Sequence, residues 1–408
     1  MHKLKNRVWL VTLIVVLTGV VVAACNFKVP PTMVVLMDEM QVSVTEGGIL
    51  MSMSVIAGII LALPAGGIIM KTGPKKLGAF SLACTLAGSV VGAVAPNFTI
   101  LMISRAIEGI GFAFISVVAP SIIALCFPPE KRGLPMALWA LWISIGMLFI
   151  FNVTNAIVPV FGWRGDWWLV AILAAVMLVV FVIFVKVPEP EADPAEQGAP
   201  QPSLKEGLQS VPSWLLCLIF ICFATVVSAF TTYFPTYIVQ VLGLDVAAAN
   251  SYSGFMAIGM IVGGLAMGFV LNKVKNRPAL LVLCMVLTGA AGYFTFEVSN
   301  PNTLLLYVFL AGLAYSMPAA TIFTVAPDSA RSPAAIGMAM SLCVLGQNIA
   351  SGIAPVIIGA VVESSGYVWG SATPILLGAG AMGVIFALLF VVAMNKKNSV
   401  FQPSGKGI

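Results

Sequence analysis

The sequence predicts an all-α membrane protein with 12 transmembrane helices in two six-helix bundles related by a pseudo-two-fold axis. Three observations support this fold class: an apolar composition, twelve long apolar segments, and a repeat that relates the two halves of the chain. Of the 408 residues, 60% are hydrophobic and 9% are charged, and the mean hydropathy is +1.07. A soluble domain carries about 25% charged residues, so most of this chain is expected to contact a lipid bilayer.

Twelve apolar segments are long enough to span a bilayer, which takes about 20 helical residues. The first six lie near 8–37, 47–70, 77–95, 99–126, 135–160 and 167–186. The other six lie near 213–241, 249–272, 278–296, 303–326, 335–361 and 371–394. Between the two sets runs a stretch rich in Pro, Glu, Ala and Gln, which cannot bury a core. The predicted organisation is an N-terminal bundle (1–186), a linker (187–212), a C-terminal bundle (213–394) and a tail (395–408).

The placement of basic residues predicts the orientation. All Lys and Arg residues except Lys28, Arg105 and Arg164 fall before the first span, in alternate loops, in the linker or in the tail. Basic residues concentrate on the cytoplasmic side of membrane proteins. We therefore expect a multi-pass protein of the cell membrane with both termini, the linker and the tail in the cytoplasm. The net charge of +5 is not gathered on a soluble face, so a nucleic-acid partner is not expected.

The stretch VVVAACNFK (20–28) has two incompatible interpretations. Val22-Ala23-Ala24-Cys25 follows a basic start and an apolar run, as at the cleavage site of a lipoprotein signal. Cleavage there would delete most of the first span and leave eleven, with one terminus on the wrong side. We therefore expect an uncleaved span, which places Lys28 inside the membrane.

The cysteines and the single histidine argue against a metal or redox centre. None of the seven cysteines forms a CxxC pair, and only His2 could add an imidazole ligand. We expect the cysteines to be small buried residues, and we expect no metal, no cofactor and no catalytic residues.

The two halves of the chain resemble each other at a nearly fixed offset. PPTMVV (30–35) matches FPTYIV (234–239), GGIIMKTGPKK (66–76) matches GFVLNKVKNR (268–277), and EGIG (108–111) matches AGLA (311–314). Equivalent segments are six spans apart, so they cross the membrane in the same direction. Parallel repeats of this kind are typical of transporters, whose site lies between the repeats near the midplane.

These features carry a family resemblance over essentially the whole chain. The 6+6 layout, the basic Gly-rich loop after the second span, its echo after the eighth, RAIEGIG (105–111) and GWRGDWW (162–168) resemble the major facilitator superfamily. The resemblance implies a gating loop, here containing Gly66, Lys71, Gly73 and Lys75. The family's usual Asp in this loop is replaced by Met70, which puts its Asp–Arg gating contact in doubt. NFKVPPTMVVLM (26–37), APSIIALCF (119–127) and GLPMALWALW (133–142) look most like the cyanate-transporter branch of small-anion carriers.

Three ionisable residues lie clearly within the spans: Lys28, Arg105 and Glu108. A charge at the bilayer centre costs about 2.5–3.5 kcal/mol, so such groups face the protein interior or a wet cavity. At a rise of about 1.5 Å per residue, all three fall in one layer of the membrane. Their charges sum to +1, which would favour an anion, and we expect Lys28 and Arg105 to bind substrate. Pro30 and Pro31 should break the helix beside Lys28.

Structural roles are the alternatives for the same residues. Arg105 and Glu108 are spaced i, i+3 on one helix, so the pair could simply brace the bundle. Lys28 could extend toward the headgroups. Glu108 is a candidate for proton coupling, although an ion pair would compete with that role.

The second half offers neutral polar groups at the equivalent positions. We expect Tyr233, Tyr237 and Gln347 to line the site and to orient a substrate, with interhelical hydrogen bonds as the alternative role.

The sequence thus predicts a secondary transporter that moves a small, anionic solute by alternating access. We expect the protein to be a monomer, and protons are a candidate coupling ion. A proton-coupled drug or metabolite exporter of the same superfamily is the first alternative. A membrane enzyme or a sensor is the second, and the sequence lacks the residues that an enzyme would need.

Overall fold

The computed structural model describes residues 2–61, 68–69, 71–128, 131–187, 208–331 and 335–401. Within these residues it contains 12 helical spans long and apolar enough to cross a membrane, which confirms the predicted fold class. The first half of the chain supplies six of them, with two spans built from paired helices: α1 (His2–Phe27) with α2 (Val29–Met40), α3 (Val44–Leu61), α5 (Pro74–Ala93), α6 (Phe98–Cys126), α7 (Gly133–Ala140) with α8 (Trp142–Phe161), and α9 (Arg164–Phe184).

The second half supplies the other six spans and two short 3-10 turns. These elements are α11 (Val211–Leu242), α12 (Val246–Lys273), α13 (Arg277–Tyr293), η3 (Phe294–Phe296), α14 (Pro301–Ser329), α15 (Ile336–Ser364), η5 (Trp369–Ala372) and α16 (Thr373–Phe401). The last helix runs beyond the predicted end of its span at 394. Most of the predicted linker and the last seven residues of the predicted tail lie outside the described residues.

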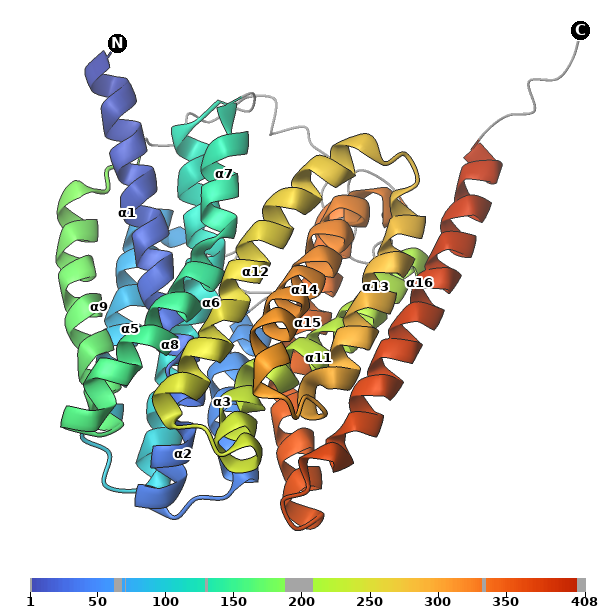
Figure 1. The fold of residues 1–408 in the computed structure, drawn as a ribbon. Helices are drawn as coiled ribbons and strands as arrows, with labels where there is room; N and C mark the ends of the chain where they lie inside the picture. The colour runs from blue at the N-terminus through green and yellow to red at the C-terminus, as the bar shows by residue number, and fades with distance from the viewer. Residues whose placement is uncertain are drawn as a thin grey trace, which may run out of the picture.

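Each half forms its own group of helices (Figure 1). Within the first half, α5 packs on α6 and α9, and α1 packs on α8. Between the halves, α3 packs on α15 and α8 packs on α12. The start of α1 and the end of α16 lie at one face, which we name the termini face, and the loops after α2, α5 and α8 lie at the other, which we name the opposite face.

The first span is broken at Lys28, as the sequence predicted. Lys28 has φ −73° and ψ −20° and separates α1 from α2. Pro30 and Pro31 follow at once and lack the N–H groups that would continue the hydrogen-bond ladder of α1. The break lies deep in the protein, where Val29, Pro30 and Pro31 are all buried.

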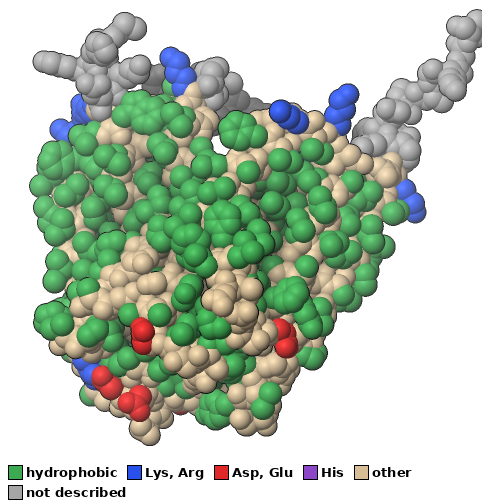
Figure 2. Space-filling model, viewed as in Figure 1, with side chains coloured by type: hydrophobic (Ala, Val, Ile, Leu, Met, Phe, Trp, Pro, Cys, Tyr) green, Lys and Arg blue, Asp and Glu red, His purple; other side chains and the backbone are tan. Residues whose placement is uncertain are grey.

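The outer surface of the bundle is apolar (Figure 2). On α9, for example, Ile172, Val176, Val179 and Ile183 are exposed at helical spacing, which places one stripe of the helix toward lipid. In Figure 2 the visible basic side chains gather mainly at the termini face, and the acidic ones lie toward the opposite face.

Small residues set the close contacts inside the bundle. Gly109 of α6 faces the backbone of Ser54 in α3, so closely that a Cβ atom at position 109 would overlap it. Backbone cannot move aside as a flexible side chain can, so only Gly fits here.

We predict that Gly109→Ala destabilises the protein by roughly 1–3 kcal/mol, because it overpacks this contact. Gly264→Ala in α12 is the matched control, since a Cβ atom there would meet nothing within 4 Å. Thermal unfolding in detergent measures both variants. Equal midpoints for the two would contradict the packing argument.

Candidate functional site

A buried charge cluster occupies the centre of the first half. Lys28 Nζ lies 2.5 Å from Glu108 Oε1, and Arg105 Nη1 lies 2.6 Å from Glu108 Oε2. The side chains of Lys28 and Arg105 are 0% exposed and that of Glu108 is 2% exposed. The predicted common layer is therefore confirmed as direct contact, and Lys28 points into the protein instead of toward the headgroups.

Arg105 holds the break in the first span. Its Nη2 donates to Asn26 O at 2.9 Å, its Nη1 donates to Cys25 O at 2.9 Å, and its Nε donates to Leu50 O of α3 at 3.2 Å. In a continuous helix the carbonyl of Asn26 would accept from residue 30, but Pro30 has no N–H. The guanidinium of Arg105 supplies the missing donor, and with its bond to the carboxylate it uses four of its five N–H groups.

The ammonium group of Lys28 is fully engaged. Besides Glu108, it donates to Ser89 Oγ of α5 at 3.1 Å and contacts Cys25 Sγ at 3.6 Å. It also lies 4.5 Å from the centre of the Trp167 ring of α9, a cation–π contact. All three of its N–H groups therefore have partners within the first half.

Both carboxylate oxygens of Glu108 accept hydrogen bonds. Oε1 accepts from Lys28 and from Ser89, whose Oγ lies at 2.9 Å, and Oε2 accepts from Arg105. Gly88 makes this possible, because a Cβ atom there would meet Glu108 itself and would push α5 away from α6. A substrate that takes over a hydrogen bond of Lys28 or Arg105 must therefore compete with Glu108.

A fourth ionisable group, Asp166 in the first turn of α9, belongs to the same region. It is 0% exposed, and Lys28 interacts with it electrostatically. The expectation of only three ionisable residues within the spans was therefore wrong, because α9 begins at Arg164 and includes Asp166. An ionised Asp166 brings the net charge of the region from +1 to zero.

Tyr233 and Tyr237 are buried in the second half instead of facing an open cavity. Tyr233 is 0% exposed, and its Oη lies 2.5 Å from Pro355 O and 3.1 Å from Val44 O. Tyr237 is 2% exposed and donates to Val298 O at 2.9 Å. Both hydroxyls are thus engaged by backbone, as in the alternative that the sequence left open.

The remaining predicted site residues are spread over the molecule. Gln347 is partly buried in α15. Lys71 and Gly73 lie between α3 and α5 at the termini face, and Lys75 lies in the first turn of α5; Lys71 is exposed and the other two are partly buried. Gly66 lies outside the described residues. The structure therefore brings together only Lys28, Arg105 and Glu108 among the predicted site residues.

Side-chain hydrogen bonds between the two halves gather toward the opposite face. Thr45 donates to Glu363 Oε2 from Oγ1 at 2.6 Å, and Tyr233 contacts Val44 O. Asn250 Nδ2 lies 3.1 Å from Pro31 O and 3.1 Å from Asn155 Oδ1. For the residues that the structure describes, every such bond between 2–187 and 208–401 belongs to this set or involves Asn155 with α12. We name these contacts the opposite-face contacts.

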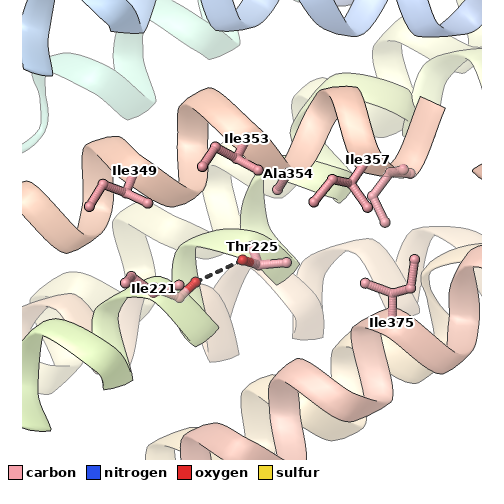
Figure 3. Close-up of a pocket in the computed structure, with 8 residues that line it drawn as sticks. Ile221, Thr225, Ile349, Ile353, Ala354, Ile357 and Ile375 are labelled. Atoms are coloured by element: carbon pink, nitrogen blue, oxygen red, sulfur yellow. Dashed lines mark hydrogen bonds between the residues drawn. The ribbon is translucent and has the colours of Figure 1, made fainter. Parts of the chain in front are cut away.

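Two cavities differ in chemistry. The first, of about 180 Å³, lies between α11, α15 and α16 and is lined mainly by Ile side chains (Figure 3). The hydroxyl group of Thr225, which also lines this cavity, donates to Ile221 O at 2.8 Å. Because the rest of the lining is apolar, this cavity does not suit a charged solute. The second, of about 300 Å³, lies between α2, α8 and α12 and is lined in part by Glu39, Thr154, Asn155 and Asn250.

The comparisons with known proteins agree with this architecture. The sequence profile of the Major Facilitator Superfamily matches residues 15–332 and 253–407. A hexuronate transporter of Bacillus subtilis (strain 168) is 25% identical over 380 residues, which cover 87% of each chain. Other alignments are partial. A B. subtilis protein named for niacin/nicotinamide transport is 22% identical over 58% of this chain and 59% of its own length. The galactose-proton symporter of Escherichia coli (strain K12) is 28% identical over 36% of this chain and 32% of its own length.

Solved structures share the fold. A bacterial homologue of the human lysosomal transporter Spinster, in an inward-facing conformation, superposes with a TM-score of 0.73 at 16% identity, covering 98% of this chain and 99% of the other. A D-xylose-proton symporter superposes with a TM-score of 0.70 at 17% identity, covering 93% and 96%.

We predict that Glu108→Gln destabilises the protein by roughly 3–5 kcal/mol, because it leaves two buried cations without their counter-charge. Combining it with Lys28→Met should recover part of that loss, since one of those cations is then gone. Chemical unfolding of the two single variants and the double variant measures the coupling. Additive losses would show that the two groups do not interact energetically.

Proposed function

The chain belongs to the major facilitator superfamily of membrane transporters, and on that premise we propose that it is a secondary transporter that moves a small anionic solute by alternating access. The observation that carries the solute class is the buried cluster, in which two cations contact a single carboxylate. The second half contributes neutral hydroxyl and amide groups at the equivalent depth.

We propose that the termini face is cytoplasmic. Basic residues concentrate there in the sequence and on the visible surface, and positive charge is retained on the cytoplasmic side during insertion. The opposite-face contacts then close the protein toward the outside, so this conformation faces inward. Transport requires these contacts to break and others to form at the termini face.

In our proposal, Glu108 is an internal anion that the solute replaces. Lys28 and Arg105 have almost no free N–H groups while Glu108 holds them, so a solute must take over some of those hydrogen bonds. Arg105 offers bidentate geometry for a carboxylate or a similar anion. Release of the solute returns Glu108 to both cations, which keeps the buried charges paired in the empty carrier.

The relatives are named for solutes of different charge, and one of them is consistent with an anion. The hexuronate transporter, which aligns with most of this chain, is named for an anion, whereas the galactose and D-xylose symporters are named for sugars. Within the anion class, the resemblance to cyanate carriers makes small inorganic anions, cyanate included, the first solutes to test. Tyr233, Tyr237 and Gln347 remain candidates for orienting the solute in other conformations.

We predict that a small anion stabilises the purified protein against thermal unfolding and does not stabilise Lys28→Met. A ligand of the folded state adds about 2.7 kcal/mol at a hundred times its dissociation constant. The panel contains small anions, lipophilic cations and neutral sugars. Lys275→Met is the control, because it removes a basic side chain exposed between α12 and α13. Stabilisation by cations alone, or an equal response of Lys28→Met, would favour an exporter instead.

We also predict that a covalent link between the two halves at the opposite-face contacts stops transport. Cysteines at positions 45 and 363, introduced with the seven native cysteines replaced, can be linked by a short reagent with two thiol-reactive groups. Exchange of the anion identified in the panel should cease after linking and resume after cleavage of the linker. Unchanged exchange in fully linked protein would rule out a gate at this face.

A further inference from the structure

Short contacts link three oxygen atoms at the second cavity, where Thr154 is a lining residue. Thr154 Oγ1 is 2.5 Å from Asp166 Oδ2 and 2.7 Å from the carbonyl oxygen of Ile150. A hydroxyl group has one hydrogen to donate, and neither a carbonyl nor an ionised carboxylate can donate. With an ionised Asp166 the two acceptors share the single hydrogen of Thr154, whereas a protonated Asp166 can donate to Thr154 Oγ1 while Thr154 donates fully to Ile150.

The other carboxyl oxygen of Asp166 is also informative. Oδ1 is buried and has no hydrogen-bond partner among the described residues, and the whole side chain is 0% exposed. Among the described residues, Asp166 therefore has a buried carboxyl oxygen that no protein donor occupies, whereas donors occupy both oxygens of Glu108.

The cavity between α2, α8 and α12 is lined both by Thr154, which contacts this carboxyl group, and by Glu39 near the end of α2 at the opposite face. Glu39, whose side chain is 44% exposed, lies at the same cavity and pairs loosely with Arg164 at 3.6 Å. Asn250, 1% exposed, also lines it and has a buried Oδ1 without a partner among the described residues. The cavity thus offers several acceptor oxygens, which suit a hydronium ion or water.

We propose that Asp166 is a proton-binding site that is loaded from the opposite face through this cavity and Thr154. A hydronium ion in the cavity gives a proton to Thr154 Oγ1 as Thr154 passes its own proton to Asp166 Oδ2, so that the carboxylate becomes a carboxylic acid and the hydronium ion becomes water. This inference rests on the proposed function only in that it supplies the coupling ion of a transporter. It does not require the solute to be an anion.

The charges around Asp166 explain how its proton would affect the cluster. Lys28 is the cation that acts on it, and Lys28 is paired with Glu108, which also holds Arg105. On its own helix, Arg164 faces Glu39 and the carbonyl of Ala95. With Asp166 ionised the four central groups sum to zero, and with Asp166 protonated they sum to +1. Binding a proton would therefore favour binding an anion, and the two would move together.

Infrared spectroscopy of the full-length protein tests the site without any solute. A protonated buried carboxyl group gives a carbonyl band that is separate from the amide bands. In protein labelled with carbon-13 at the aspartate side chains, this band should shift to lower frequency, and on raising the pH of the buffer it should disappear. The labelling needs no substitution, so misfolding cannot obscure the result. Absence of the band at acidic pH, or a band that the aspartate label does not shift, would overturn the proposal.

Substitutions assign the band to Asp166. Asp166→Asn should abolish it, and Asp38→Asn, which changes an exposed aspartate of α2, should leave it unchanged. Thr154→Val should shift its frequency, because the acid then loses its acceptor. A band that persists in folded Asp166→Asn would overturn the assignment. Since no solute is present, failure here would leave the anion proposal standing, and failure of the anion panel would leave the proton site standing.

Discussion

The hydrogen bonds of Arg105 to the broken first span are the interaction on which the rest of the site depends. Pro30 removes a donor from α1, and the guanidinium replaces it while also binding the backbone of α3 and the carboxylate of Glu108. These contacts fix where Glu108 stands, and Glu108 in turn positions the ammonium group of Lys28. A proline that costs the helix one hydrogen bond is thus part of how two cations are kept deep in an apolar protein.

The same arrangement explains how a carrier can hold buried charge and still respond to a ligand. An isolated charge at this depth costs about 2.5–3.5 kcal/mol, but here each charged group has partners on several helices, with α1, α3, α5, α6 and α9 meeting at one place. Any ligand that competes for these partners changes the balance among those helices. The opposite-face contacts are built from neutral amides and hydroxyls and a single carboxylate, and in our proposal they are the part of the interface that opens.

Much of this could be predicted from sequence because apolar length and charge placement are local properties. The spans, the break at Lys28, and the common layer of Lys28, Arg105 and Glu108 follow from composition, proline chemistry and helical rise. The direction of a side chain around its helix does not, because the neighbours that decide it are distant in sequence. Hence Tyr233 and Tyr237 were expected at an open site and lie against backbone carbonyls. Asp166 was missed because a short run of turn residues conceals that the helix after it begins buried; its position between Trp163 and Trp167 in an apolar segment was the available signal.

The central claim is that Arg105 supplies the donor that Pro30 withholds, and a double-mutant cycle between these residues tests it most directly. Pro30→Ala restores the N–H that can reach the carbonyl of Asn26. We expect Arg105→Gln to destabilise the Pro30→Ala protein measurably less than the native protein, with a coupling energy of about 0.5–3 kcal/mol, as found for residues that share a partner. The same loss of stability in both backgrounds would contradict the claim and would leave Arg105 with only its ion pair to Glu108.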